Sequence, residues 1–183
     1  MLVFEFKTYG KATQFQAVDE AIRTTQFIRN KAIWLWMDGQ AKSWVELSRH
    51  CALLAKEFPF ADKLNSMARQ AAAERAWFAI SRFYDNCKKE VNASLPLQGS
   101  AHCVDFKVAG KKGFPQFQKD CRSVEYKTSG WKLADDRKSI TFTNKNGIGK
   151  LKLKGTRDLN FYQVNQIKRV KLVRRADGVY AQF

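Results

Sequence analysis

The stretch GKKGFPQFQKDCRSVEYKTS, residues 110–129, contains lysines, two glycines, a Phe-Pro pair and a second phenylalanine. It separates two halves of the chain that follow different patterns. Before it, hydrophobic residues recur at helical spacing, and after it they alternate as in strands. We predict that this stretch re-enters a β structure after a helical insertion. Gly113 and Pro115 would shape the turn, and Phe114 and Phe117 would anchor it.

The charge of the chain is strongly positive. Its 183 residues include 33 Lys and Arg against 17 Asp and Glu, a formal net charge of +16. Residues 101–183 hold 19 of the basic and seven of the acidic side chains, together with many aromatic residues. A disordered basic tail would be poor in aromatic residues, so we expect the charge on a folded surface. A polyanion such as nucleic acid is the expected partner.

Other compositional features exclude several classes of protein. No apolar run approaches the roughly 18–20 residues that a membrane span needs, so we expect no membrane partner and a cytoplasmic location. The four cysteines lie far apart and form no Cys-x-x-Cys pair, which argues against a disulfide framework. A hydrophobic fraction of 45% is enough for a folded core.

Hydrophobic periodicity predicts an α+β protein. We expect three amphipathic helices, the second ending before Phe58-Pro59 and the third N-capped by Asp62, at residues 15–38, 44–57 and 62–87. Residues 92–113 are rich in glycine and polar residues and are interpreted as a connection. Alternation and Asn-Gly or Asp-Gly turns predict a small sheet or barrel with strands at residues 2–7, 139–143, 148–154, 166–175 and 179–183.

Basic side chains follow the β half and its approach. The alternation GKLKLK, residues 149–154, predicts a row of three lysines on one face of a strand. Lysine and arginine bind phosphates, and aromatic rings between them stack on unpaired bases. The candidate RNA and phosphate contacts are Lys111, Lys112, Lys119, Arg122, Lys150, Lys152, Lys154, Lys168, Arg169 and Lys171.

Signals for catalysis or metal binding are weak. The sequence has no P-loop, dinucleotide-binding glycine pattern or zinc-protease motif. Two His-Cys pairs can supply a zinc site or a Cys-His nucleophile, although isolated cysteines usually pack as small hydrophobic residues. One Asp pair fits either a metal site or a solvated turn. These three pairs are His50-Cys51, His102-Cys103 and Asp135-Asp136.

Several segments together resemble a known family. GKKGFPQFQK, residues 110–119, resembles the G-x-x-x-F-P-x-F-K-K signature of TnpB proteins, transposon-encoded RNA-guided DNA endonucleases related to type V CRISPR effectors. Further segments resemble that family in the same order and at similar spacing. They are QFIRN at residues 26–30, YKT at 126–128, GKLKLK at 149–154 and the strand pair at 168–183.

The resemblance implies a specific architecture. Residues 1–10 and 110–183 would form a wedge β-barrel similar to an oligonucleotide-binding fold, and residues 11–109 would be a helical recognition domain inserted into it. The RuvC-like nuclease of the family would follow Phe183. We therefore expect no catalytic residues, metal ligands or cofactor in this chain, and magnesium only in that nuclease domain.

The resemblance also implies the partners. They would be a structured guide RNA and double-stranded target DNA beside a short transposon-adjacent motif, in a prokaryotic protein associated with the nucleoid. The residues that match positions facing the DNA motif are Trp44, Ser48, Ser66, Met67, Arg69, Gln70, Lys127 and Thr128. Ser66 stands where the family has a basic residue. A core position for Trp44 and a merely solvated Gln70 remain open alternatives.

Two other functions compete with this hypothesis. The helical half can act as a helix-turn-helix unit in a stand-alone DNA-binding regulator of a mobile element, which would bind a defined duplex site without RNA. An enzyme that uses the Cys and His residues would lose its activity on replacement of Cys51 or Cys103.

Overall fold

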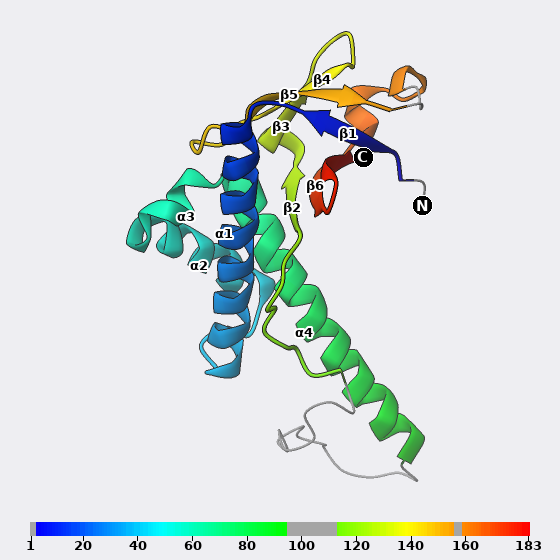
Figure 1. Cartoon of the computed structure of the whole chain (residues 1–183). Coiled ribbons are helices and arrows are strands. Elements are labelled where there is room, and N and C mark those ends of the chain that lie inside the picture. The colour runs from blue at the N-terminus through cyan, green and yellow to red at the C-terminus, as the bar shows by residue number, and fades with distance from the viewer. Residues whose placement is uncertain (1–2, 95–112, 156–158) are drawn as a thin grey trace.

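A computed structural model describes residues 3–94, 113–155 and 159–183 as a group of helices beneath an antiparallel sheet (Figure 1). The helices are α1 (Ala12–Met37), α2 (Trp44–Glu57), α3 (Pro59–Lys63) and α4 (Ser66–Ser94). The strands are β1 (Glu5–Tyr9), β2 (Ser123–Lys127), β3 (Trp131–Leu133), β4 (Ser139–Phe142), β5 (Gly149–Lys154), β6 (Arg169–Arg175) and β7 (Gly178–Gln182). Three 3₁₀ turns are η1 (Thr128–Gly130), η2 (Leu159–Phe161) and η3 (Val164–Gln166). The predicted mixture of helix and sheet is confirmed.

The first two helices agree with the sequence prediction. α1 buries a stripe that includes Val18, Ile22 and Ile28, as its periodicity requires. α2 begins with a capping box, in which the carboxylate of Glu46 accepts a hydrogen bond of 2.9 Å from the backbone N–H of Ser43. This reciprocal capping satisfies backbone donors that have no partner inside the helix.

The predicted N-cap of the third helix is wrong. α2 ends before Pro59, and Pro59 begins a separate short helix, α3. In the first turn of a helix the missing N–H of proline leaves no hydrogen bond unmade. Asp62 lies inside α3, and α4 starts after Asn65, whose side-chain oxygen accepts a hydrogen bond of 2.8 Å from the N–H of Met67. The side chain of Asn65 therefore takes the capping role that we expected of Asp62.

In the described residues, the sheet has seven antiparallel strands in the order β2-β6-β7-β1-β5-β4-β3. It is open, so the expected closed barrel is not confirmed. β2 and β3 form its two edges, yet η1 alone connects them in the chain. The four Cα steps from Lys127 to Trp131 can span at most about 14 Å. The sheet must therefore curve until its two edges meet at one corner.

Two of these strands were absent from the sequence prediction. β2 has only two strongly apolar residues, and β3 is three residues long, so neither shows a clear alternation. The predicted first strand, at residues 2–7, is found two to three residues later, at Glu5–Tyr9. The predicted hairpins are confirmed as β4-β5 and β6-β7.

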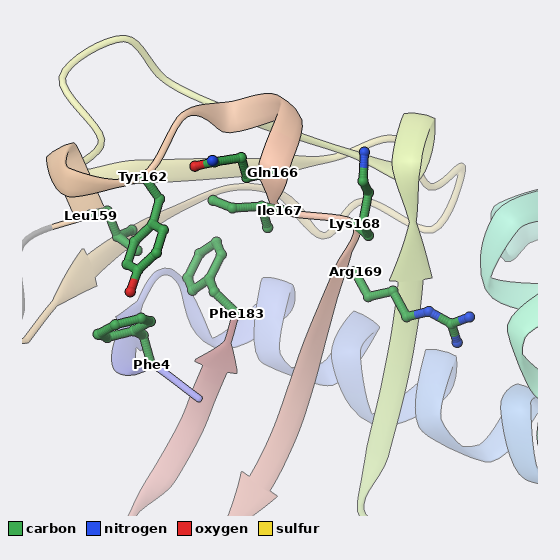
Figure 2. Close-up of a pocket in the computed structure, with 8 residues that line it drawn as sticks. All are labelled: Phe4, Leu159, Tyr162, Gln166, Ile167, Lys168, Arg169 and Phe183. Carbon is green, nitrogen blue, oxygen red and sulfur yellow. The ribbon is translucent and has the colours of Figure 1, made fainter. Parts of the chain in front are cut away.

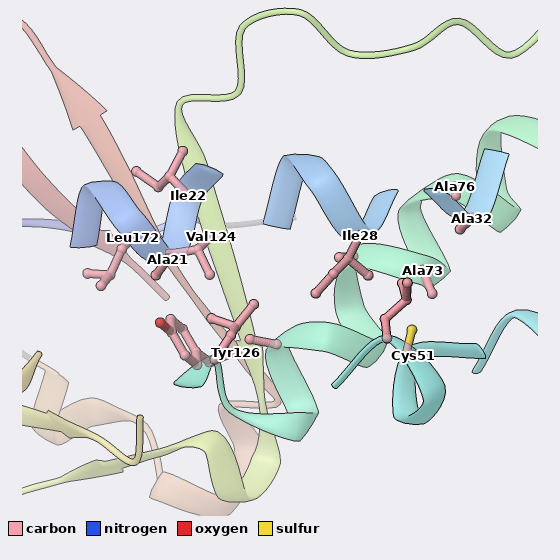
Figure 3. Packing of buried hydrophobic residues seen from close by; sticks show 14 of the residues in the cluster. Ala21, Ile22, Ile28, Ala32, Cys51, Ala73, Ala76, Val124, Tyr126 and Leu172 are labelled. Carbon is pink, nitrogen blue, oxygen red and sulfur yellow. The ribbon is translucent and has the colours of Figure 1, made fainter. Parts of the chain in front are cut away.

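Helices and sheet share one continuous hydrophobic core (Figure 3). Ala21 and Ile22 of α1 pack near Val124 of β2 and Leu172 of β6. Tyr126 is fully buried, lies 4.7 Å from the ring of Phe142, and accepts a hydrogen bond from Asn144. Because the core continues across the two layers, the position of the sheet is fixed relative to the helices.

The approach to β2 runs along α1 and α4 (Figure 1). Phe114 anchors it, since its ring lies 5.5 Å from Trp36 of α1 and 5.3 Å from Phe83 of α4. Pro115 is buried. Phe117 is 47% exposed, so the prediction that both rings anchor this stretch is right for Phe114 and wrong for Phe117.

Two side chains of α1 hold the backbone of this approach. Asn30 accepts from the N–H of Gln118 at 2.8 Å and donates to its carbonyl oxygen at 2.9 Å. Gln26 accepts from the N–H of Cys121 at 2.9 Å and donates to the carbonyl oxygen of Lys119 at 3.3 Å. The segments at residues 26–30 and 110–119, which carry the family resemblance, therefore contact each other.

Gly155, directly after β5, offers a test of this packing. A Cβ atom there would lie 2.5 Å from the ring of Phe6, well inside van der Waals contact. Gly155→Ala should lower the free energy of unfolding by about 1–3 kcal/mol, measured by urea denaturation. In a Phe6→Leu background the same substitution should cost less, because the smaller side chain leaves room for the methyl group. Equal costs in both backgrounds would contradict this packing.

Candidate nucleic-acid interface

Four of the predicted DNA-facing residues meet where the helices join the sheet. We call this group, Trp44, Met67, Lys127 and Thr128, the junction site. The ammonium of Lys127 lies 5.5 Å from the centre of the Trp44 ring, within the range of a cation–π contact. The hydroxyl of Thr128 lies 3.7 Å from the sulfur of Met67. Residues from α2, α4, β2 and η1 thus come together at one place.

An ion-pair network fastens the junction site. Glu74 of α4 binds Lys127 at 2.8 Å and Arg169 of β6 at 2.7 Å, and Arg169 also binds Glu125 of β2 at 2.7 Å. Two carboxylates thus face two cations. The positive charges of Lys127 and Arg169 are compensated within the protein, so a phosphate must compete with Glu74 and Glu125 for them.

The pKa values of this network follow from its geometry. Burial disfavours the ionised carboxylate of Glu74, but hydrogen bonds from Lys127 and Arg169 outweigh burial and hold the pKa of Glu74 below its ordinary value. The hydrogen bond to Glu125, assisted by the one to Glu74, raises the pKa of Arg169. The Glu74–Arg169 pair is therefore ionised at neutral pH.

The backbone at Thr128 is strained. Its φ of 26° lies in the left-handed region, which a β-branched residue rarely adopts. Nearby, Gly130 packs closely, because a Cβ there would lie 3.2 Å from Asn65 and 3.3 Å from Met67. Strained conformations of this kind cluster at functional sites, where the surrounding structure over-determines them.

The remaining predicted DNA-facing residues lie around the junction site without joining it. The guanidinium of Arg69 turns inward and donates to the carbonyl oxygens of Ala61 and Leu64, each at 2.9 Å, so it holds the end of α3. Ser66 is exposed at the start of α4, and Gln70 follows one turn later, half-buried. Ser48 is half-buried on α2. Trp44 is partly buried and packs against the core, as the structural alternative for it expected, while its contact with DNA stays a prediction.

The predicted row of lysines is confirmed. Lys150, Lys152 and Lys154 are exposed on β5 and alternate with Leu151, which is buried in the core. The ammonium of Lys154 lies 5.9 Å from the centre of the Tyr9 ring on the neighbouring strand β1. We call these three side chains the β5 lysine row.

The other predicted phosphate contacts do not form one patch with this row. Lys119 and Arg122 are exposed on the approach to β2, where Arg122 lies 3.3 Å from Asp120. Lys168 is exposed and donates to the carbonyl oxygen of Asn165 at 2.8 Å. Burial, together with the charge of the nearby Arg75, lowers the pKa of the half-buried Lys171. Lys111 and Lys112 lie outside the described residues.

Sequence reasoning missed the residues that organise the junction site. Glu74 is one of several polar residues on an alanine-rich helix. The sequence around it gives no signal that it pairs with Lys127 and Arg169. Asn65, which caps α4, also donates to Thr143 at 2.8 Å and so links the helices to the segment after β4. An Asn shortly before a helical pattern is a recognisable capping signal in the sequence. The contact with Thr143 could be identified only from the three-dimensional structure.

The structure gives little support to the catalytic and metal-binding pairs that the sequence offered. Burial raises the pKa of the Cys51 thiol to about 11, so it is protonated at neutral pH and a poor nucleophile. His102 and Cys103 lie outside the described residues. Asp136 accepts a hydrogen bond of 3.0 Å from the N–H of Lys138, as in a turn between two strands. Within the described ranges, no three His, Cys, Asp or Glu residues group as metal ligands would.

Comparison of the amino-acid sequence with protein-family models and with curated proteins finds no match. Among the helices in the described part of the chain, none has the length and apolar character needed to cross a bilayer.

The ion pairs of Glu74 predict a dependence of stability on acid. Because the pKa of Glu74 is lowered on folding from its ordinary 4.5, its contribution is complete above pH 4.5 and is lost as the pH falls through the folded-state value. Glu74→Gln should destabilise the protein at pH 7 by about 1 kcal/mol. The difference from the parent protein should shrink below pH 4.5, measured by thermal unfolding across pH.

Asp120→Asn provides the control, since Asp120 is 73% exposed in its pair with Arg122. It should change the stability at pH 7 by less than Glu74→Gln does, because an exposed ion pair is screened by solvent. A Glu74→Gln variant that differs from the parent protein by the same amount at pH 3 and pH 7 would refute the assigned role of Glu74.

Proposed function

We propose that this chain is the guide-RNA-binding and target-DNA-recognition module of a TnpB-like RNA-guided endonuclease. In this proposal the chain supplies binding, and strand cleavage belongs to a RuvC-like domain with its magnesium ions outside residues 1–183. The partners are a structured transposon-derived RNA and duplex DNA carrying a short motif, in a prokaryotic cytoplasm near the nucleoid. In RNA-guided systems of this type, base pairing with the guide RNA reads the target sequence, and the protein recognises the shape of the nucleic acid and a short DNA motif.

One observation carries the proposal. The resemblance assigned eight residues to the DNA motif, and four of them, Trp44, Met67, Lys127 and Thr128, come from distant parts of the sequence. These four residues lie together at the junction site. A chance resemblance would have no reason to select residues that share one place in the fold. The contact between residues 26–30 and 110–119, two segments that carry the resemblance, supports the same conclusion.

The wedge assignment belongs to the same proposal. We propose that the curved sheet, whose edges meet through η1, corresponds to the wedge domain, and that α1 to α4 correspond to the recognition domain. The β5 lysine row then faces RNA phosphates, and the junction site approaches the DNA. The row suits this role because its ammonium groups are exposed and spaced along one strand.

The salt dependence of RNA binding tests the role of the β5 lysine row. Each phosphate contact contributes about 0.7–0.9 to the slope of log affinity against log salt. Replacing Lys150, Lys152 and Lys154 together with glutamine should reduce that slope by about two to three, measured by fluorescence anisotropy with a structured RNA hairpin. An affinity of the parent protein that stays flat from low to moderate salt would overturn the proposed function.

Three exposed lysines of the helical half form a matched control for charge. Replacement of Lys42, Lys56 and Lys88 by glutamine removes the same net charge away from β5. This control should change the slope by less than the β5 variant does. Equal changes would show that only net charge matters and would remove the β5 lysine row from the interface.

Substitutions of Thr128 distinguish an effect on DNA binding from an effect on stability. Glycine tolerates a φ of 26°, so Thr128→Gly should leave the free energy of unfolding unchanged or raise it by up to about 1 kcal/mol. The same variant should weaken binding to duplex DNA in the RNA-bound protein, because the hydroxyl is lost. Thr128→Ser, which keeps the hydroxyl, should bind like the parent protein. Unchanged affinity of the glycine variant would exclude Thr128 from the DNA contact.

The competing regulator hypothesis predicts a different outcome in the same assays. A helix-turn-helix regulator would select one duplex sequence from a random pool without RNA. Such selection by RNA-free protein would replace the present proposal.

A further inference from the structure

A pocket of about 430 Å³ opens at the end of the sheet where β1 begins and β7 ends (Figure 2). Its wall adjoins the junction site, because Arg169 pairs with Glu74 and the carbonyl oxygen of Lys168 accepts a hydrogen bond of 3.2 Å from the N–H of Thr128. Phe4 and Phe183 line it from the two neighbouring strands, and the segment from η2 to β6 supplies the other wall. That wall consists of Leu159, Tyr162, Gln166, Ile167, Lys168 and Arg169.

Three aromatic rings form the body of the pocket. The rings of Phe4 and Tyr162 lie 5.3 Å apart at 54°, and in Figure 2 the ring of Phe183 stands between them and Ile167. Phe183 is supported from behind by Phe6 at 5.7 Å and by Trp131 at 6.4 Å, both edge to face. A ligand with a flat aromatic surface would find rings of this kind on more than one side.

The pocket is preformed. The backbones of Phe4 and Phe183 pair through hydrogen bonds of 3.2 and 2.9 Å. On the opposite wall, the guanidinium of Arg137 donates to the carbonyl oxygens of Leu159 and Tyr162. These contacts hold both walls without a ligand, which reduces the ordering cost of binding.

The polar groups at the rim favour an anionic ligand with a polar edge. Lys168 is exposed beside the pocket, and Figure 2 shows its ammonium directed away from the rings. The carboxamide of Gln166 accepts a hydrogen bond of 2.9 Å from the N–H of Gln163. None of the described residues that line the pocket is acidic. An aromatic interior beside the exposed ammonium of Lys168 matches a base attached to its phosphate.

We propose that this pocket binds one unstacked nucleobase of a single-stranded segment, with the adjoining phosphate at Lys168. The proposal deepens the proposed function and rests on it, since the nucleotide belongs to the bound nucleic acid. The volume suits a single base with part of its sugar, at the lower end of the usual range for ligand sites. Stacking on aromatic side chains is tolerant of sequence, so the pocket would fix the path of the strand.

Oligonucleotides with and without bases test the proposal. The probes are fluorescein-labelled U10, dT10 and a ten-residue abasic strand with the same number of phosphates. Binding of each to the full chain is measured by fluorescence anisotropy at one salt concentration. We expect the abasic strand to bind about tenfold more weakly than U10 or dT10. A difference between U10 and dT10 would assign the base to RNA or to DNA.

Variants locate the effect in the pocket. Tyr162→Ala should weaken U10 about tenfold and leave the abasic strand within about twofold, and Tyr162→Phe should bind like the parent protein. Phe78→Ala, which removes an exposed ring of α4 outside the pocket, should leave both affinities unchanged. If Tyr162→Ala fails to fold, Ile167→Trp decides, because it fills the pocket without removing a wall and should weaken U10 alone.

The outcomes separate this proposal from the function on which it rests. Equal affinities for U10 and the abasic strand, both falling with salt, would overturn the base pocket and leave nucleic-acid binding in place; an apolar side chain of a protein partner would then be the better occupant. Equal losses for both strands in Tyr162→Ala or Ile167→Trp would also overturn it. Failure of every strand to bind at low salt would overturn both proposals.

Discussion

The fold depends on the packing of residues 113–127 against α1 and α4. Side chains of α1 hold the backbone of this segment at Gln118 and Cys121, and Phe114 is inserted against α1 and α4. The segment then becomes β2, whose buried Tyr126 lies in the interior of the sheet. Because β2 belongs to both layers, the helices and the sheet form one core, and the junction site keeps a fixed geometry.

The basic side chains fall into two groups, those paired with carboxylates and those exposed on β5. Around the junction site, Lys127 and Arg169 are paired with carboxylates, so they orient neighbouring groups and hold the helix to the sheet. On β5 the ammonium groups are exposed and suit direct phosphate contact. Under the proposed function, the paired charges hold Trp44 and Thr128 in position, and the exposed lysines of β5 contact phosphate.

The sequence predicted the parts of the fold that repeat a simple pattern. α1 and α2, the two hairpins and the β5 lysine row follow from periodicity and turn residues. β2 was missed because its burial comes from both layers, and β3 because three residues carry no period. The partners of Glu74 and the inward turn of Arg69 depend on which elements meet in space, and local sequence contains no signal for that. The resemblance named the junction residues, but the sequence could not say that they touch.

The most direct test of the central claim is the identity of the nucleic acid that the protein retains. The chain would be purified at low salt from bacterial cells that carry its native locus, and the bound nucleic acid would be sequenced after separate treatment with RNase and DNase. The proposal predicts a discrete, structured RNA that is released as salt is raised. Retention of DNA alone, or of no nucleic acid at low salt, would contradict it.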